Sequence, residues 1–304
     1  MQAIDDVIET LPVLGVGASL SFGVQPDPVD LALEPRGPAF IEYAGAVQHD
    51  WMAASINKLQ RHQVPLLYHP SCLNLCGPFA NTRPWVEAVA RHVAATHSAW
   101  LAQDVAICFA SKTPGYSIQL GYFIPPILTA ASLDEATTRV QEVTALLEVP
   151  LLLEPAPVTF VLGDMPALEW LNALSERTGC GLLLDAGHLV SHQLAARGEL
   201  LAGLEALDLS RVVELHIAGG VIEPAQDGSP PIYIDAHDLP ILPETWQVAR
   251  AVLERAPNLK AVCVECEGTA AQTVLGMLQA ARERVAVATC NPALAAKVEE
   301  ELAP

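Results

Sequence analysis

Side chains that commonly bind metal ions recur at the ends of short apolar runs in this sequence. Five runs end in this way, at His69, Glu154, Asp185, His216 and Glu265. An apolar run that closes on a polar residue is typical of a parallel strand that is buried on both faces and opens on a pocket at its carboxyl end. If these strand ends converge, their side chains would form a metal site.

Four further residues complete the candidate ligand set: Asp104, His188, Asp235 and His237. The i, i+2 spacing of Asp235 and His237 puts both side chains on one side of an extended segment. Each carboxylate alone could equally cap the next helix. Together the set would bury about five negative charges, which a fold cannot offset without cations. Oxygen and imidazole ligands suit iron, manganese or zinc, and nine ligands exceed what one ion uses, so we expect a multinuclear site.

Strand and helix patterns alternate along the whole chain. Eight strands are expected, at residues 13–18, 39–44, 64–69, 101–108, 149–154, 180–185, 212–218 and 260–266. Eight βα units without a flexible linker predict an α/β fold with one (β/α)8 TIM barrel, of the xylose-isomerase-like kind, over residues 1–290. Residues 291–304 are expected to form an extra helix. A doubly wound sheet is the alternative, but a GxGxxG motif after the first strand is missing.

Local signals mark several helix ends. Thr82 is expected to be an N-cap, and Ser132-Leu-Asp-Glu135 to be a capping box before a helix at 136–147. Met165-Pro166 opens another helix, which Gly179 ends in a left-handed conformation. Pro243 begins the helix after that.

Composition limits the class of protein. The 304 residues are 51% hydrophobic, yet no run approaches 18 apolar residues, so a membrane partner is not expected. A net charge of −19 argues against a nucleic-acid partner. The first residues do not resemble a signal peptide, and seven scattered cysteines fit a reducing compartment, so a cytoplasmic location is expected. The pairs Cys72/Cys76 and Cys263/Cys266 are better explained as core residues than as zinc ligands.

Several segments taken together resemble the DUF692 family, the multinuclear non-haem iron-dependent oxidative enzymes. The resemblance extends over most of residues 13–267, and its strongest segments are 150–154, 171–185 with His188, 213–219 and 234–240. It implies a TIM barrel with two or three irons, in mixed Fe(II) and Fe(III) states, that uses O2 as co-substrate. It also implies the reaction: modification of cysteine in a ribosomally made precursor peptide, for example by β-carbon excision or oxazolone-thioamide formation, with a separate partner protein that recognises the peptide. The family's ligand positions correspond here to His69, Glu154, Asp185, His216, Asp235, His237 and Glu265.

The chain departs from the family pattern at three places. Gln103-Asp104 stands where many members have Glu-His, so Asp104 would replace an imidazole ligand. His188 stands where many members have Asn, and Gly219-Gly220 where Gly-His is usual. Glu42 and Asn74 are expected to contact the ligands or the substrate.

Two other functions remain open from the sequence alone. The Asp-x-x-His and Asp-x-His spacings are also similar to those of xylose-isomerase-like barrels, which include sugar isomerases and epimerases as well as zinc endonucleases. An endonuclease needs a basic groove, which the charge disfavours. The third possibility is a metal-dependent scaffold that binds a peptide without catalysis.

Overall fold

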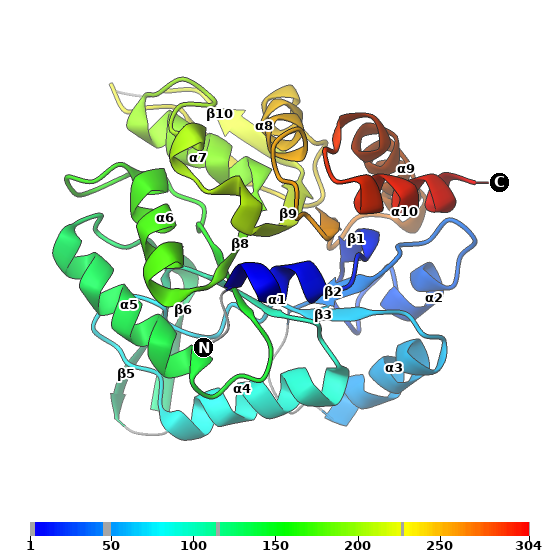
Figure 1. Cartoon of the computed structure of the whole chain (residues 1–304), viewed down its shortest axis with the longest axis horizontal. Coiled ribbons are helices and arrows are strands. Elements are labelled where there is room, and N and C mark those ends of the chain that lie inside the picture. Colours follow the sequence, from blue (N-terminus) through cyan, green and yellow to red (C-terminus); the bar gives the residue numbers. More distant parts are fainter. Residues whose placement is uncertain (1–3, 45–49, 114–115, 226–227, 304) are drawn as a thin grey trace.

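A closed barrel of eight parallel strands forms the centre of the computed structural model, which describes residues 4–44, 50–113, 116–225 and 228–303 (Figure 1). The strands follow the order β1-β12-β9-β8-β7-β4-β3-β2 around the barrel. They are β1 (Gly15–Ser19), β2 (Ile41–Tyr43), β3 (Leu66–Tyr68), β4 (Leu101–Asp104), β7 (Leu151–Glu154), β8 (Gly181–Asp185), β9 (Val212–Ala218) and β12 (Ala261–Glu265). The predicted TIM barrel is therefore confirmed.

One helix follows each barrel strand and covers its outer face. These helices are α2 (Pro28–Ala32), α3 (Asp50–Arg61), α4 (Arg83–Thr96), α5 (Ala130–Thr144), α6 (Ala167–Thr178), α7 (Ala186–Ala196), α8 (Pro243–Leu253) and α9 (Ala271–Ala288). Two short 3-10 turns, Leu204–Ala206 and Leu209–Arg211, precede β9. Among the described residues, no helix has both the length and the apolar character needed to cross a membrane.

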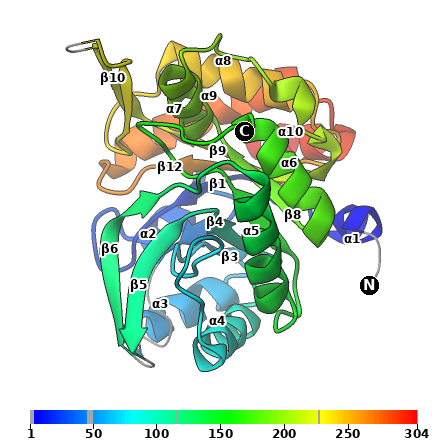
Figure 2. The ribbon, with the colours of Figure 1, turned by 90° about the vertical axis from the view of Figure 1, so that its left-hand side faces the viewer.

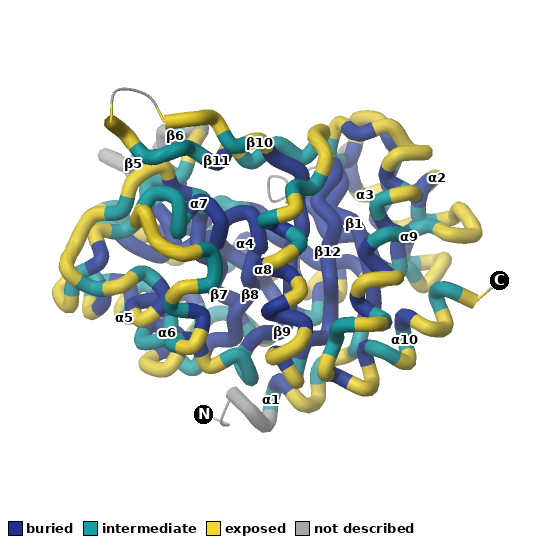
Figure 3. The backbone as a smooth tube through the Cα atoms, turned by 90° about the horizontal axis from the view of Figure 1, so that it is seen from above, coloured by how far each residue is buried: buried dark blue, intermediate teal, exposed yellow. Residues whose placement is uncertain are grey.

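The two ends of the barrel differ. Helix α1 (Ile4–Thr10) lies at the amino end, where Ile8 packs against the interior residues Phe40 and Leu67. Two antiparallel hairpins rise from the carboxyl end, one made of β5 (Ile107–Thr113) and β6 (Tyr116–Ile124), the other of β10 (Gly220–Glu223) and β11 (Ile232–Asp235). Figures 2 and 3 show both hairpins on the face opposite α1. The carboxyl ends of the barrel strands and the two hairpins therefore lie on the same side of the molecule.

A terminal helix, α10 (Pro292–Leu302), packs against α9 and β1. Glu301 of α10 accepts hydrogen bonds from the backbone N–H of Val16 and from the buried guanidinium of Arg282. Arg282 also donates to the carbonyls of Arg36 and Gly37, so one arginine joins α9, α10 and the segment before β2. Residues 1–3 and 304, at the ends of the predicted barrel domain and terminal helix, lie outside the described part of the chain.

Two local predictions need correction. The expected strand at 101–108 ends at Asp104, because the apolar residues after it turn outward; Ala106 and Cys108 pack with Ala156 at the base of the β5-β6 hairpin. The expected capping box at Ser132 lies one turn earlier. Thr129 is the N-cap of α5, and the Thr129 and Ser132 side chains each accept a hydrogen bond from the other's backbone N–H.

The other helix ends predicted from the sequence are confirmed by the structure. Thr82 is the N-cap residue of α4, although its side chain makes no cap hydrogen bond. Pro166 is the N-cap of α6, and Gly179 ends that helix with a φ of 68°. Pro243 is the first residue of α8.

Candidate metal centre

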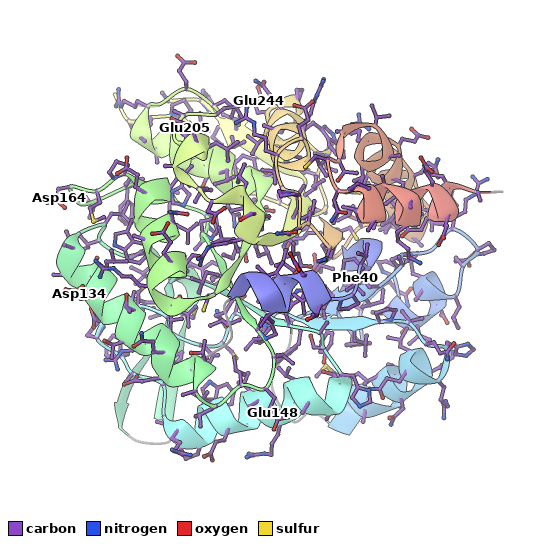
Figure 4. All side chains as sticks on the ribbon, in the orientation of Figure 1. Phe40, Asp134, Glu148, Asp164, Glu205 and Glu244 are labelled. Atoms are coloured by element: carbon purple, nitrogen blue, oxygen red, sulfur yellow. The ribbon has the colours of Figure 1, made fainter. Side chains whose placement is uncertain are left out.

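The inward-facing residue at the carboxyl end of every barrel strand is polar. These eight residues, in chain order, are Ser19, Glu42, His69, Asp104, Glu154, Asp185, His216 and Glu265. The strand register pairs Ser19 with Glu265, Asp104 with Glu154, and Asp185 with His216, so the side chains converge in one layer. Beneath them, Phe40, Leu67, Ala102, Leu152 and Leu183 form an apolar floor inside the barrel. Figure 4 shows Phe40 near the centre of the view, whereas the labelled carboxylates, including Glu148 and Glu205, lie at the periphery.

The first ligand group joins β3, β4 and β7. His69 Nε2 lies 3.0 Å from Glu154 Oε2 and 3.4 Å from Asp104 Oδ2. Ser71 donates a 2.7 Å hydrogen bond to the same Asp104 oxygen. Glu154 also reaches His188, because its Oε1 lies 3.1 Å from His188 Nδ1. Glu154 is thus shared between two imidazoles.

Asp185 combines a helix cap with a place in the centre. Its Oδ1 accepts the backbone N–H of His188 at 2.6 Å as the N-cap of α7, while its buried Oδ2 has no hydrogen-bond partner. Helix capping and metal binding, which the sequence left as alternatives for this residue, are therefore compatible, because each would use a different oxygen of Asp185. His188 lies in the first turn of α7, where its Nε2 is 3.4 Å from Asp235 Oδ2.

The β10-β11 hairpin brings in two more candidates. Asp235 ends β11, and His237 follows with its Nε2 3.2 Å from Asp235 Oδ2 and 3.7 Å from Glu265 Oε2. These three residues could hold one ion.

His216 lies at the bottom of the centre and is fully buried. Its Nδ1 is 3.3 Å from Glu265 Oε1, and its Nε2 is 3.3 Å from Glu42 Oε1 and 3.7 Å from Glu214 Oε1. Glu42 also lies 3.7 Å from His69 Nδ1, so it is placed to support two imidazoles from below. Trp100 donates a 2.7 Å hydrogen bond to the other oxygen of Glu214.

Unsatisfied polar atoms show that this layer is suited to cations. Buried side-chain atoms without a hydrogen-bond partner include both oxygens of Glu154, both ring nitrogens of His216 and one atom each of His69, Asp185, Asp235 and Glu265. Such atoms are costly in a protein interior unless an ion or water satisfies them. Within the described residues, five overlapping groups of three or four side chains are spaced closely enough to bind an ion. Four of these groups contain only carboxylates and imidazoles, a donor set that fits iron, manganese or zinc, and the fifth joins Glu42, Glu214 and His216 with the Cys263 thiol.

The charges of the centre shift its pKa values strongly. Burial alone would lower the pKa of the imidazoles, but facing carboxylates raise it, to about 12 for His237 and well above the ordinary value for His69, His188 and His216. Burial, opposed by His188, raises the pKa of Asp185 to about 7. Without metal, the facing carboxylates therefore favour the protonated form of the four imidazoles.

Metal binding is consequently expected to release protons and to strengthen as the pH rises. A metal ion competes with the protons on the imidazoles and on Asp185, so lowering the pH from about 8 to about 6 should weaken the apparent affinity. Titration calorimetry in buffers of different ionisation enthalpy measures the protons released. An affinity that stays constant over this range would contradict the placement of these imidazoles as ligands.

The residues that depart from the family pattern have clear positions in the structure. Gln103 is buried, and its Oε1 accepts hydrogen bonds from the backbone N–H groups of Cys72 and Leu73, so it fixes the loop after β3. Asn74, expected to contact ligands or substrate, is also buried. Its Oδ1 accepts from Cys108 and Phe109, and its Nδ2 donates to Phe79 and Phe109. All its amide positions are used within the protein, so the structure gives Asn74 a structural role instead.

A tyrosine fills the space beside Gly220. A Cβ atom on Gly220 would lie 2.5 Å from the Tyr233 hydroxyl, and one on Gly187 would lie 2.3 Å from it. The two glycines therefore make room for the buried Tyr233 ring, whose hydroxyl donates to the Gly219 carbonyl. A larger side chain at position 220 would displace this tyrosine.

Four residues of the site were not predicted from the sequence: Ser19, Glu214, Tyr233 and Glu267. Glu214 is two residues before His216 on β9, and Glu267 two residues after Glu265, so period-two spacing was the available signal for both. An irregularity in the β8-β9 register at Val213 places Val213, Glu214 and His216 all inside the barrel.

Fold and site together define a class of protein: a (β/α)8 barrel with a cluster of potential metal ligands at the carboxyl end of its strands. The family model for the RiPP precursor modification enzymes MbnB/TglH/ChrH matches residues 39–286. The chain belongs to this family, which is the DUF692 family of the sequence analysis. The members are enzymes that modify precursors of ribosomally made peptides.

Curated relatives agree with this membership. A UPF0276 protein of Paraburkholderia phytofirmans is 28% identical over 225 residues, which cover 70% of this chain and 66% of the relative, slightly under two thirds of its length. The UPF0276 protein RB0508 of Rhizobium meliloti is 28% identical over 259 residues, or 80% and 77% of the two chains.

Solved structures confirm the barrel type. A xylose isomerase domain protein from Planctomyces limnophilus superposes with a TM-score of 0.57 at 11% identity, over 91% of this chain and all of the other. A xylose isomerase-like TIM barrel protein from Mycobacterium smegmatis, in complex with magnesium, gives 0.57 at 12% identity, over 92% and 98%. At such identities the likeness concerns the fold alone.

Proposed function

We propose that this chain is an O2-dependent oxidase with two or three irons that modifies cysteine residues of a ribosomally synthesised precursor peptide. One observation carries the proposal: the carboxyl end of the barrel of a peptide-modifying family holds a connected layer of carboxylates and imidazoles with unsatisfied buried atoms. The particular product, such as β-carbon excision or an oxazolone-thioamide, is a further part of the same proposal.

The connectivity of the ligand layer supports more than one ion. Glu154 contacts both His69 and His188, and Glu265 contacts both His216 and His237. Each of these carboxylates would therefore serve two neighbouring ligand groups if both held an ion. We assign the iron ligands to His69, Asp104, Glu154, Asp185, His188, His216, Asp235, His237 and Glu265. Glu42 supports His69 and His216 from inside the barrel.

Iron bound in this layer would supply two kinds of chemistry, Lewis-acid binding of a cysteine thiolate and activation of O2. The chain itself supplies a dry floor, because Leu67, Leu152 and Leu183 close the barrel below the ligands. The two hairpins lie on the other side of the ligands (Figure 3), where the side chains of His237 and Asp235 are 27% and 20% exposed. A peptide thiol would approach from that side.

A peptide-recognition partner protein forms part of the proposal. The net charge of −19 would favour a basic partner surface or a basic leader segment of the peptide. Raising the ionic strength would then weaken the association.

Mass spectrometry of candidate peptides tests the proposed function. Iron-loaded protein, incubated in air with its partner and a cysteine-containing precursor peptide encoded nearby, should change the peptide mass. The same peptide with Cys→Ser should stay unchanged, and so should the cysteine peptide under nitrogen. Oxygen-independent interconversion of an aldose and a ketose with Mn(II) or Mg(II) would instead establish the sugar isomerase. Tightly bound metal without oxygen consumption would establish the peptide-binding scaffold.

A further inference from the structure

The imidazole of His237 has a hydrogen-bonding partner on the side of the ring that faces away from the candidate ligands. Its Nε2 points toward Asp235 and Glu265, as described above, while its Nδ1 lies 2.6 Å from Glu267 Oε2. The two ring nitrogens therefore face two different sets of carboxylates. Glu267 belongs to none of the described residue groups that could hold an ion.

We infer that Glu267 is a positioning residue for His237 at the metal centre. A neutral imidazole carries its proton on either nitrogen, and only the form protonated on Nδ1 leaves Nε2 free to bind a metal. A carboxylate that accepts the Nδ1–H selects this form, fixes the ring orientation and makes the ligand more basic. The inference rests on the proposed function only in requiring a metal ion beside Asp235, His237 and Glu265.

Glu267 is itself held in place by a neighbouring strand. Ser19, the inward-facing residue at the end of β1, donates a 2.5 Å hydrogen bond to Glu267 Oε1. The two carboxylate oxygens thus have different partners, Ser19 on one and His237 on the other, which fixes the carboxylate plane. Ser19 is the one member of the inward polar layer that is neither acidic nor an imidazole, and this contact gives it a role.

A second contact joins the same two segments. Thr269 donates a 3.0 Å hydrogen bond from its side chain to the backbone carbonyl of His237. The segment after β12 therefore holds both the ring and the backbone of His237, and Glu265, the last residue of β12, faces the same ring from the other side. Glu265 and Glu267 thus contact the imidazole of His237, and Thr269 contacts its backbone.

The inference separates metal affinity from protein stability. The His237 and Glu267 side chains are 27% and 25% exposed, so water screens this ion pair in part; ion pairs at a protein surface contribute about 0–1 kcal/mol to folding. Loss of an acceptor behind a metal-binding histidine typically costs about 10–100-fold in metal affinity. Glu267→Ala should therefore weaken metal binding strongly while leaving the unfolding of the metal-free protein nearly unchanged.

Co(II) titration of the full-length protein tests this expectation. Glu267→Ala should weaken the affinity of the last cobalt ion by about 10–100-fold. Glu267→Gln, which keeps a neutral acceptor, should recover part of that affinity, and Ser19→Ala should show a smaller loss in the same direction. Glu223→Gln, on the exposed outer part of β10, is the control for loss of one negative charge near the hairpin and should have no effect.

A double-mutant comparison distinguishes positioning from a general effect on the fold. In a His237→Ala background, Glu267→Ala should cause no further loss of cobalt affinity. An equal loss in both backgrounds, or no loss in the wild-type background, would overturn the inference, as would a wild-type protein that binds no Co(II). Because the measurement is metal affinity, it can succeed even if the iron-loaded protein oxidises no peptide.

Discussion

Glu154→Ala is expected to abolish the metal centre and the activity with it. Glu154 is buried, contacts His69 at 3.0 Å and His188 at 3.1 Å, and has no hydrogen-bond partner for either oxygen. Without it, two imidazoles lose the carboxylate that they share. Replacing even an outer partner of a ligand costs about 10–100-fold in metal affinity, so removing this carboxylate should cost more than about 100-fold.

Metal analysis and thermal unfolding check the expectation together. Anaerobically purified wild-type protein should contain at least two irons per chain, and Glu154→Ala at least one fewer. A metal present at about 1,000 times its dissociation constant stabilises a fold by about 4 kcal/mol, and the variant should lose most of this added stability. Glu148→Ala, an exposed carboxylate just before β7 (Figure 4), is the control and should behave like wild type. Full metal content and activity in Glu154→Ala would refute the assignment of this residue.

Gly219→Ala is expected to have the second large effect, on both stability and metal content. A Cβ atom at this position would lie 1.8 Å from the Leu239 carbonyl oxygen and 2.9 Å from that of Ala236. These are backbone atoms of the turn that carries His237, so a rotamer change cannot relieve the clash. The Gly219 carbonyl also accepts the Ala236 N–H, which fixes the turn against β9. The turn should shift and carry Asp235 and His237 away from Glu265.

The expected loss of stability is about 3 kcal/mol, at the upper end for overpacking of a buried site. Urea unfolding of the metal-free protein measures it, and metal analysis measures the accompanying loss of an ion. Gly276→Ala in α9 is the matched control, since a Cβ there meets nothing within 4 Å and a helical Gly→Ala change should be neutral or slightly stabilising. A Gly219→Ala protein as stable as wild type would show that the turn is not fixed at this glycine.

The barrel and the positions of most candidate ligands could be predicted from the sequence. Parallel strands buried on both faces are apolar throughout, so Glu154, Asp185 and His216 stood out at their ends. The same contrast explains the error at 101–108, where apolar residues continue past Asp104 because they form the base of a hairpin instead of a strand. The sequence pattern alone does not distinguish apolar residues of a barrel strand from apolar residues buried at the base of a hairpin.

Other features depend on tertiary contacts that no local pattern contains. Asn74 was predicted as a binding residue from its place after His69, but its amide is fully used by Phe79 in its own loop and by Cys108 and Phe109 more than thirty positions away. Glu214 lies inside an apolar strand, where a bulge at Val213 turns it inward. The Tyr233 ring between Gly187 and Gly220 depends on segments that meet only in the folded chain.

The contacts of β1 and α10 bear on how the chain folds during synthesis. β1 closes the barrel by pairing with β12, and the Val16 N–H binds Glu301, a residue 285 positions away. One edge of the first strand therefore stays unpaired until residues 261–265 have been synthesised and have left the ribosome. Unpaired strand edges are prone to aggregation, and non-local pairing is slow. The nascent protein should consequently depend on chaperones for longer than a protein of equal size built from local contacts.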